Sequence, residues 1–324
     1  MEIVVDKVVS LLNLSNLKDF SNYYSFLCPF HNEKNNSFII YKNTGKYICF
    51  SCGEEGSLYD LVKRLTGKSI YKFLGINYNN YTFINSLNRD KDKDNSRFKK
   101  IQEIKNKDIV IENSFKSVYD NKQVLDYLYS RDVNESIIND FNIQYTEYSL
   151  INGTKFYKRI ITPIYYNNKI LSYEGRDYTR RQLPKVLYPK NTSVNNCILN
   201  IDKLDINNTL YVVEGFMDII KIYKYISKNV TCIFGAKISD YQIELLKQFK
   251  EFVIIPDNDE AGETTILKLE EYMDKEFYIA KLDKSKDCGD ASIEEIEVAI
   301  KNKKLSVDYF IDKNDLFSKE NISW

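Results

Sequence analysis

From residue 210 onward, the chain alternates short apolar runs with segments in which apolar residues recur at helical spacing. The apolar runs predict strands at 210–213, 230–234, 252–255 and 277–282. The segments of helical periodicity that follow them end near residues 226, 249, 273 and 300. Strands that lack a polar face are buried on both sides. The pattern therefore predicts a parallel sheet covered by helices on both faces.

The first 77 residues show a different pattern. Apolar residues between positions 4 and 12 recur at helical spacing and predict a helix. Residues 37–41 and 46–49 are expected to form two strands, joined by a turn at Asn43-Thr44-Gly45. A helix is expected again at 58–65. The segment therefore predicts a small β-hairpin module with a helix on either side in the sequence.

The middle of the chain separates these two regions. Residues 88–107 are rich in Lys, Asp, Asn and Arg with few apolar positions, which indicates a solvated linker. Short helices are expected around 130–132, and strands at 156–161, 164–166 and 170–173. The expected divisions are a first domain, a linker, a mixed α/β subdomain, a parallel-sheet subdomain and a tail, at 1–77, 78–113, 114–205, 206–300 and 301–324.

Composition limits the class of protein. A chain of 324 residues fits two or three domains. Lys and Arg together number 46, as do Asp and Glu, so any attraction to a polyanion must come from local basic patches. Three of the six cysteines fall in a metal-binding spacing, which favours a reducing compartment over a disulfide framework. No membrane span or signal segment is predicted, so we expect a soluble, cytoplasmic protein without a membrane partner.

Four residues near the amino terminus have the spacing of a zinc site. Cys28 and His31 are separated by two residues, seventeen residues follow, and Cys49 and Cys52 again enclose two. Two close pairs of soft ligands joined by a longer excursion can surround one tetrahedral Zn²⁺. His31 is the only histidine of the chain. Because all four positions are filled by protein, the predicted zinc is structural and not catalytic.

Acidic residues follow three of the predicted strands. In parallel α/β sheets, ligands bind beyond the carboxyl ends of the strands. Clustered carboxylates repel one another unless cations lie between them, and oxygen ligands suit Mg²⁺ or Mn²⁺. Two such ions support phosphoryl transfer. The residues expected to form this acidic pocket are Glu214, Asp218, Asp257, Asp259, Asp287 and Asp290.

Glu214-Gly215 after an apolar strand, followed by Asp257-x-Asp259, resembles the Toprim domain, which DnaG-type primases share with type IA and type II topoisomerases and some nucleases. Cys28-Pro29-Phe30-His31 with Cys49-Phe50-Ser51-Cys52 resembles the zinc-binding domain of bacterial and phage primases. Residues 156–164 and 183–189 resemble the first strand and the basic stretch of the primase core. The resemblance implies an α+β multidomain fold, with a zinc ribbon, a mixed α/β subdomain and a Toprim parallel-sheet subdomain.

The same resemblance implies roles for individual residues. Glu214, Asp257 and Asp259 would be catalytic and hold Mg²⁺ or Mn²⁺, and Asp218, Asp287 and Asp290 would complete the pocket. The spacing of Asp287 and Asp290 is looser than Asp-x-Asp, which leaves the metal role of Asp290 open. Contacts to template phosphates or to the incoming triphosphate would come from Lys158, Arg159, Arg176 and Lys185.

The implied activity is a DNA primase, a nucleotidyltransferase that joins ribonucleoside triphosphates into short RNA primers de novo on single-stranded DNA. The zinc hairpin, with Lys34, Lys42 and Lys46 beside Phe38, Tyr41 and Tyr47, would read the template. Gly67-Lys68-Ser69 lacks the first glycine of a phosphate-binding loop, since Val62 occupies that position. A replicative helicase is therefore expected in trans. The compact length suggests a phage or plasmid origin.

Two alternatives stay open at this point. One is another Toprim enzyme, such as a nuclease or a topoisomerase-like strand cleaver, since 26 tyrosines offer many covalent nucleophiles. The other is a non-catalytic zinc-ribbon DNA-binding protein of the replication assembly. DNA cleavage with Mg²⁺ but without nucleotides would favour the first alternative, and absence of RNA synthesis on varied templates would favour the second.

Overall fold

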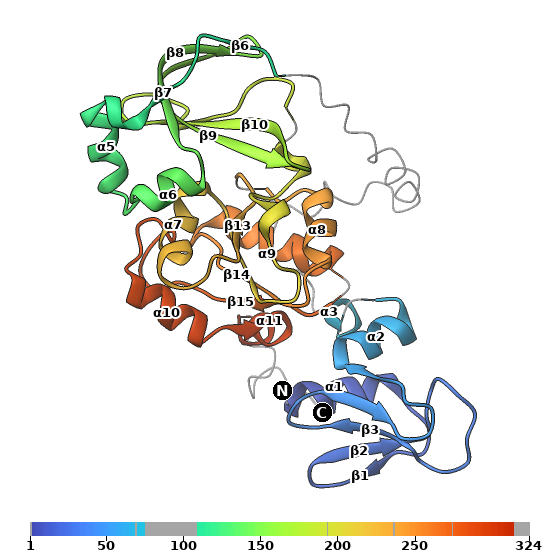
Figure 1. Cartoon of the computed structure of the whole chain (residues 1–324). Coiled ribbons are helices and arrows are strands. Elements are labelled where there is room, and N and C mark those ends of the chain that lie inside the picture. The colour runs from blue at the N-terminus through green and yellow to red at the C-terminus, as the bar shows by residue number, and fades with distance from the viewer. Residues whose placement is uncertain are drawn as a thin grey trace. The chain divides into compact units, whose positions relative to one another are not determined.

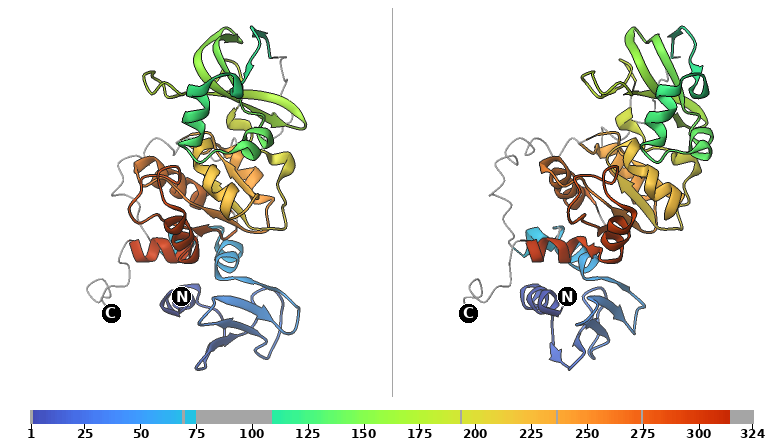
Figure 2. Two further views of the ribbon diagram at one scale, coloured as in Figure 1. Left: turned by 60° about the vertical axis from the view of Figure 1, so that its left-hand side comes forward. Right: turned by 90° about the vertical axis from the view of Figure 1, so that its left-hand side faces the viewer.

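The computed structural model describes residues 2–68, 70–74, 109–192, 194–235, 237–273 and 275–313, and Figures 1 and 2 trace the chain. The described residues divide into two compact units. The first unit contains residues 2–74 with Met273–Glu276 and the described residues from Lys304 on, and the second contains the rest. The predicted linker at 88–107 and the last residues of the tail lie outside the described residues.

The first unit is built on an antiparallel sheet in the order β1-β2-β3-β4-β5. Its first helices and its strands are α1 (Glu2–Leu12), β1 (Lys18–Asp19), β2 (Tyr23–Phe26), β3 (Phe38–Tyr41), β4 (Lys46–Cys49), β5 (Glu55–Ser57), α2 (Leu58–Thr66) and α3 (Ile70–Phe73). The short strand β16 (Lys304–Leu305) and helix α11 (Ser306–Lys313) also belong to this unit. The predicted hairpin and helices are confirmed, whereas β1, β2 and β5, which complete the sheet, are not in the sequence prediction.

One face of this sheet forms the core of the unit. Phe26, Phe38, Ile40 and Tyr47 alternate with outward-facing residues and are almost fully buried. Helix α2 begins with a capping box in which Ser57 and Asp60 bind one another's backbone amides, and Gly67 ends it in the left-handed conformation. Local sequence therefore determines both ends of the helix that closes the module.

The second unit begins with an antiparallel sheet in the order β11-β10-β9-β8-β6, with β7 also paired to β8. Its elements are β6 (Ile111–Glu112), β7 (Lys116–Ser117), the 3-10 helix η4 (Val118–Asp120), α5 (Lys122–Tyr129), α6 (Glu135–Asp140), β8 (Gln144–Ile151), β9 (Thr154–Tyr166), β10 (Lys169–Asp177) and β11 (Val186–Leu187). Two short 3-10 helices, η5 (Val194–Asn196) and η6 (Ile201–Lys203), lead to the next sheet.

The prediction of separate strands at 156–161 and 164–166 is wrong, because both belong to β9. Strand β8 pairs only with Thr154–Ile161, so the rest of β9 is an edge on that side. Pro163 lies in this edge portion, where a missing backbone N–H costs no ladder hydrogen bond. The chain can therefore pass through a proline without ending the strand.

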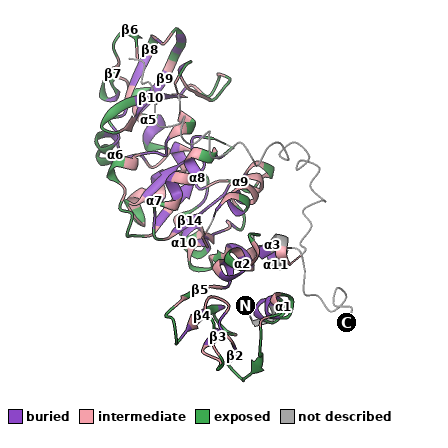
Figure 3. Ribbon diagram, turned by 90° about the vertical axis from the view of Figure 1, so that its right-hand side faces the viewer, coloured by how far each residue is buried: buried purple, intermediate pink, exposed green. Residues whose placement is uncertain are grey.

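The parallel sheet of the second unit has the strand order β13-β12-β14-β15. Its elements are β12 (Leu210–Val213), α7 (Phe216–Tyr225), β13 (Val230–Cys232), α8 (Asp240–Lys247), β14 (Phe252–Ile254), α9 (Glu260–Tyr272), β15 (Tyr278–Ile279) and α10 (Ile293–Lys301). The predicted alternation and fold class are confirmed, although β15 is shorter than the predicted 277–282. Figure 3 shows buried residues along the strands of this sheet, including β14, and exposed residues on the outer helix faces.

Helix α7 packs beside α10, and α8 packs beside α9, so helix pairs cover the parallel sheet. Strands β12, β14 and β15 are neighbours that run in one direction, so their carboxyl ends meet at one edge. No helix among the described residues is long and apolar enough to cross a membrane.

Candidate functional site

The structure brings the four predicted zinc ligands together in the first unit. The ligand atoms of Cys28, His31, Cys49 and Cys52 all lie within 4.8 Å of one another. The sulfur atoms of Cys28 and Cys52 are 3.9 Å apart, and the Cys49 sulfur is 3.9 Å from His31 Nδ1. Around a tetrahedral zinc, sulfur–sulfur and sulfur–nitrogen edges measure about 3.8 and 3.6 Å. The group therefore fits a structural Zn²⁺.

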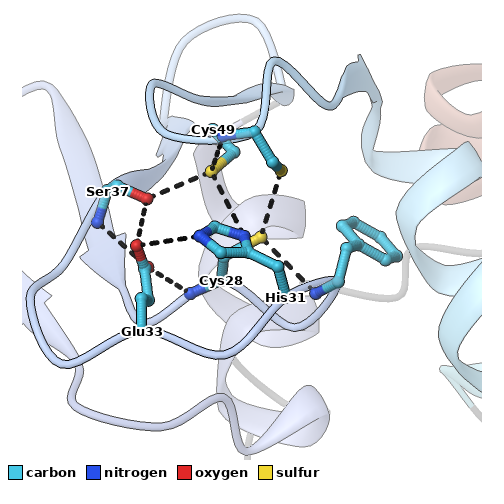
Figure 4. A network of polar contacts seen from close by, with 7 residues as sticks. Cys28, His31, Glu33, Ser37 and Cys49 are labelled. Atoms are coloured by element: carbon cyan, nitrogen blue, oxygen red, sulfur yellow. Dashed lines mark hydrogen bonds and ion pairs between the residues drawn. The ribbon is translucent and has the colours of Figure 1, made fainter.

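A second layer of polar contacts fixes the orientation of these ligands (Figure 4). His31 turns Nδ1 toward Cys49 and Nε2 toward Glu33, whose Oε2 lies 3.3 Å away. The carboxylate of Glu33 also accepts the amide of Cys28 at 2.7 Å and the hydroxyl of Ser37 at 2.6 Å. A carboxylate on the far nitrogen of a ligand histidine selects the tautomer that leaves the other nitrogen free to bind metal.

Cys49 is prepared for metal binding by its hydrogen bonds. Its sulfur lies 3.1 Å from Ser37 Oγ and accepts the amide of Cys52 at 3.4 Å. Burial opposes ionisation, but these hydrogen bonds outweigh it and lower the pKa of the Cys49 thiol to about 7. A substantial fraction of Cys49 is therefore thiolate at neutral pH, which is the form that binds zinc.

The outer face of the same sheet carries a groove of 660 Å³. Phe20, Tyr41 and Phe50 line it and are exposed to 43, 37 and 68%. Lys18 and Lys34 line it as well. Tyr23, opposite Tyr41 in the strand register, stacks on Phe20 with ring centroids 4.7 Å apart. The groove therefore combines aromatic surfaces with positive charge.

This groove corrects part of the prediction for the zinc hairpin. Phe38 and Tyr47 are exposed to 0 and 2% and belong to the core, so they cannot contact a template. Lys42 is paired with Asp19 at 2.6 Å. Phe20 and Phe50 were not singled out from the sequence. Phe20 comes close to the turn between Cys49 and Cys52 only when β1 and β2 join the sheet.

In the second unit, the predicted acidic residues other than Asp290 gather at the carboxyl edge of the parallel sheet. Glu214 follows β12, Asp257 and Asp259 follow β14, and Asp287 lies in the loop after β15. Glu214 is 7% exposed, and its Oε1 is a buried oxygen without a hydrogen-bond partner. In the described part of the chain, only the Cys/His group has ligand atoms already close enough to share an ion. The carboxylate oxygens of the acidic residues are near one another but lie further apart than the ligand atoms of the Cys/His group.

The mutual repulsion of these carboxylates is visible in their pKa values. Burial, followed by the charge of Asp259, raises the pKa of Glu214 to about 7. Burial and the charges of Glu214, Asp218 and Asp287 raise the pKa of Asp257 to about 8. Burial and Asp287 likewise raise the pKa of Asp218 to about 6. A divalent cation placed among them would remove this repulsion, as the chemistry of oxygen ligands allows.

The loop after β14 is held in place by its own side chains. Asp259 Oδ1 accepts the amides of Ala261 and Gly262 at 3.0 and 3.1 Å, which caps α9. These hydrogen bonds and Lys286, 3.4 Å from Oδ2, outweigh burial and lower the pKa of Asp259. Asn258 donates to the carbonyls of Leu282 and Ser285 at 3.0 and 2.7 Å, joining this loop to the loop that carries Asp287.

Two residues beside this loop were missed from the sequence. A Cβ on Gly262 would lie 2.2 Å from the carbonyl oxygen of Asp257, so α9 can start this close to the acidic loop only with glycine there. The signal available was Asp257-Asn258-Asp259 followed by a glycine in the first turn of a predicted helix. Lys286, in the loop after β15, was also missed, although its Nζ lies 3.4 Å from Asp259 Oδ2.

The four residues predicted to bind phosphate have different environments in the structure. Arg159 is 3% exposed and donates to the carbonyls of Gly175, Pro184 and Lys185, so the predicted phosphate contact is not supported for this side chain. Lys185 is exposed, and Lys158 lies 5.5 Å from the ring of Tyr157. Arg176 donates to the hydroxyl of Tyr127 at 2.8 Å and is an electrostatic neighbour of Asp218.

The buried Arg159 shapes the basic loop between β10 and β11. It holds carbonyls at the end of the loop, while Asp177 accepts the amides of Thr179, Arg181 and Gln182 at 2.8 to 2.9 Å. Burial opposes ionisation, but these amides lower the pKa of Asp177 to about 2. The exposed Arg180, Arg181 and Lys185 are therefore presented on a loop of fixed conformation.

Comparison with known proteins agrees with this geometry. Residues 2–74 match the family described as CHC2 zinc finger, and residues 211–292 match the Toprim-like family. The DNA primase of Clostridium acetobutylicum is 26% identical over 290 residues, covering 78% of this chain and 48% of that protein. The DNA primase of Lactococcus lactis is 27% identical over 322 residues, covering 82% of this chain and 49% of that protein. The chain thus spans about half the length of the curated relatives it matches.

Solved structures share the fold. The zinc-binding and RNA polymerase domains of the Aquifex aeolicus primase superpose with a TM-score of 0.53 at 18% identity, covering 98% of this chain and 90% of that chain. A DnaG primase catalytic domain bound to ssDNA gives a TM-score of 0.51 at 17% identity, covering 60% of this chain and 75% of that chain. At these identities the likeness concerns the fold alone.

Fold, metal-binding residues and relatives together define a protein that combines a CHC2 zinc ribbon with a Toprim core. In sequence the chain is similar to bacterial DNA primases, and in fold it is similar to the zinc-binding and RNA polymerase domains of the Aquifex aeolicus primase.

We expect Glu33→Gln to weaken zinc binding by about 10- to 100-fold, as is usual when an outer partner of a metal-binding histidine is removed. Glutamine keeps an oxygen for the Cys28 amide but loses the charge that faces His31 Nε2. Competition with a chromogenic zinc chelator measures the affinity. Lys34→Gln is the matched control, and Cys49→Ser should lose zinc. Wild-type affinity in Glu33→Gln would show that Glu33 does not orient the histidine.

We expect Asp177→Asn to loosen the basic loop in a pH-dependent way. Because the folded pKa of Asp177 is lowered, its stabilisation is fully present above the ordinary value near 3.8 and is lost as the pH falls toward 2. The shift corresponds to about 2 kcal/mol. Amide-exchange protection at Thr179, Arg181 and Gln182 should drop in the variant at pH 6, and the difference should shrink below pH 3. Equal protection in wild type and variant at pH 6 would contradict this account.

Proposed function

We propose that this chain is a DNA primase, which synthesises short RNA primers de novo on a single-stranded DNA template by nucleotidyl transfer. The observation that supports it most directly is the acidic edge of the Toprim sheet, where Glu214, Asp257, Asp259 and Asp287 come from three neighbouring strands. The same chain carries a zinc site and an aromatic groove in its first unit. A primase requires both a polymerising site and a means of holding the template.

The acidic edge has the chemistry of a divalent-cation site. Glu214 presents a buried carboxylate oxygen without a partner, which is costly unless a ligand binds there. All the side chains concerned offer oxygen, which suits Mg²⁺ or Mn²⁺. When bound, such cations would neutralise the charge that develops on the attacking and leaving oxygens. Glu214, Asp257 and Asp259 are the residues we assign to hold them, with Asp287 beside them.

The proposed reaction joins two ribonucleotides. The 3′-oxygen of one nucleotide attacks the α-phosphorus of the next triphosphate, a new P–O bond forms, and the bond to the β-phosphate oxygen breaks. Pyrophosphate leaves, and the proton of the 3′-hydroxyl passes to solvent or to a carboxylate of the pocket. Two free nucleotides must be held in line at the start, so much of the catalysis is positioning. Lys286, Arg176 and Lys185 supply positive charge for the triphosphate and the template.

The zinc ribbon is proposed to hold the template. Aromatic rings exposed along a positively charged groove stack successive bases while lysines neutralise the backbone. Phe20, Tyr41 and Phe50 with Lys18 and Lys34 form such a groove on the sheet face opposite the core. Zinc would serve this function indirectly, by fixing the turn that carries Phe50 between Cys49 and Cys52. A replicative helicase supplied in trans would provide the single-stranded template.

We expect Asp257→Asn or Asp259→Asn to lower primer synthesis by about 100- to 1,000-fold, because a bound divalent cation contributes several kcal/mol to transition-state stabilisation. Labelled ribonucleotide incorporation on mixed-sequence single strands measures this, with and without a chelator. Asp283→Asn, an exposed acid in the neighbouring loop, is the matched control.

Template binding should persist in the aspartate variants, since the groove is in the other unit. Wild-type priming by either variant would refute the assignment of the metal site. Cleavage of DNA by the wild-type chain in Mg²⁺ without nucleotides would favour the strand-cleaving alternative.

We expect Phe50→Ala and Tyr41→Ala each to weaken binding of single-stranded DNA by about 5- to 100-fold, the usual cost of losing one base–aromatic stack. Lys34→Gln should lower the salt dependence of binding by about one counterion. Fluorescence anisotropy with labelled oligonucleotides at several salt concentrations measures both. Leu11→Ala, exposed on α1 and outside the groove, is the control. Unchanged affinity in both aromatic variants would exclude the groove as the template site.

A further inference from the structure

Two of the six acidic residues predicted to hold metal use their carboxylates elsewhere. Asp218, in the first turn of α7, accepts the amide of Gly215 on Oδ2 and the amide of Gly289 on Oδ1, both at 3.0 Å. Gly215 directly follows Glu214, and Gly289 lies two residues after Asp287. One carboxylate therefore fastens together two loops that each carry a proposed metal ligand.

The glycines show how closely the two loops approach this carboxylate. A Cβ on Gly215 would lie 2.8 Å from Asp218 Oδ2, and a Cβ on Gly289 would lie 3.0 Å from Oδ1. A side chain at either position would displace the Asp218 carboxylate or the loop. Glycine at these two positions therefore lets the two backbone amides approach the Asp218 carboxylate without displacing it.

Two basic side chains also hold the loop that contains Gly289. Lys221, one turn beyond Asp218 on α7, donates to the carbonyl of Gly289 at 2.9 Å and to the carbonyl of Ala291. Arg131, from the segment between α5 and α6, binds Asp290 Oδ1 at 2.8 Å. Asp290 thus forms an ion pair with Arg131.

We propose that Asp218 and Asp290 are positioning residues for the loop of residues 286–291. Asp218 holds this loop against α7, and Asp290 holds it against Arg131 in the segment between α5 and α6. Glu214, Asp257, Asp259 and Asp287 are then the side chains left to hold cations. Asp218 still adds negative charge to the site, but both its oxygens are engaged by backbone amides. The assignment rests on the proposed function, since it divides the acidic residues of that site into ligands and supports.

The first experiment compares Asp290→Asn with Arg131→Gln in the full zinc-loaded chain. Mn²⁺ binding is measured by titration calorimetry in the presence of template and a non-hydrolysable triphosphate. If Asp290 acts through Arg131, the two variants lower Mn²⁺ affinity by the same factor, and the double variant adds nothing further. If Asp290 binds the cation, Asp290→Asn loses affinity while Arg131→Gln keeps or gains it, and the assignment is overturned.

The second experiment tests whether Asp218 holds the two loops through the amides of Gly215 and Gly289. Asparagine offers one oxygen and one donor group in place of two acceptors, so Asp218→Asn must lose one of the two amide bonds. Amide exchange at Gly215 or Gly289 should then rise by about 10- to 100-fold. The number of Mn²⁺ ions bound should stay as in the wild type, in contrast to Asp257→Asn. A variant that loses a bound Mn²⁺ while both amides keep their protection would assign Asp218 as a ligand.

Amide exchange is measured without metal, so it separates this proposal from the proposed function. If the wild-type chain binds no Mn²⁺ at the acidic edge, the polymerising role is refuted. Rapid exchange at Gly215 or Gly289 in Asp218→Asn would still support the positioning role of Asp218, and unchanged protection at both amides would refute it.

Discussion

Carboxylates that gather at the carboxyl edge of a parallel sheet repel one another, and the second unit depends on opposing that repulsion. Glu214 and Asp257 have raised pKa values because burial and neighbouring negative charges both disfavour ionisation. Without restraint, the loops that carry them would move apart. Backbone amides on Asp218, the side chain of Asn258 and the cap of α9 at Asp259 hold them in place. Part of the folding energy is thus used to keep charges close, which favours the binding of a cation.

The first unit meets a different constraint. Its sheet is small, and a core of this size gains limited stability from apolar burial alone. Four metal ligands at the ends and turns of the sheet can connect its strands through one ion. With the inner face and the ligand turn fixed in this way, the outer face can leave Phe20 and Phe50 exposed. Exposed aromatic rings of this kind are the usual feature of a surface that binds single-stranded nucleic acid.

The limits of sequence reasoning are clearest at individual residues. Two strands were predicted at 156–161 and 164–166, but one strand passes through Pro163, because β8 does not extend that far along β9. Arg159 has the residue type of a phosphate ligand, yet it lies beneath the basic loop and binds three carbonyl oxygens. Phe38 and Tyr47 were expected to face the template, whereas the alternation along β3 and β4 turns them into the core. In the first two cases another strand or loop decides the outcome, and in the third the face of the sheet that is buried decides it.

Sequence by itself determined the zinc ligands, the alternation of strands and helices, and the acidic residues at the strand ends. These features follow from local order: ligand pairs act within single turns, and an acid next to an apolar run lies at the end of a strand. Tertiary structure decided which of those acids are available to a cation. Asp218 is engaged by Gly289, 71 residues away, and Asp290 by Arg131, 159 residues away. Whether a carboxylate is free depends on which distant backbone or side-chain group packs against it, and spacing along the chain carries no information about that.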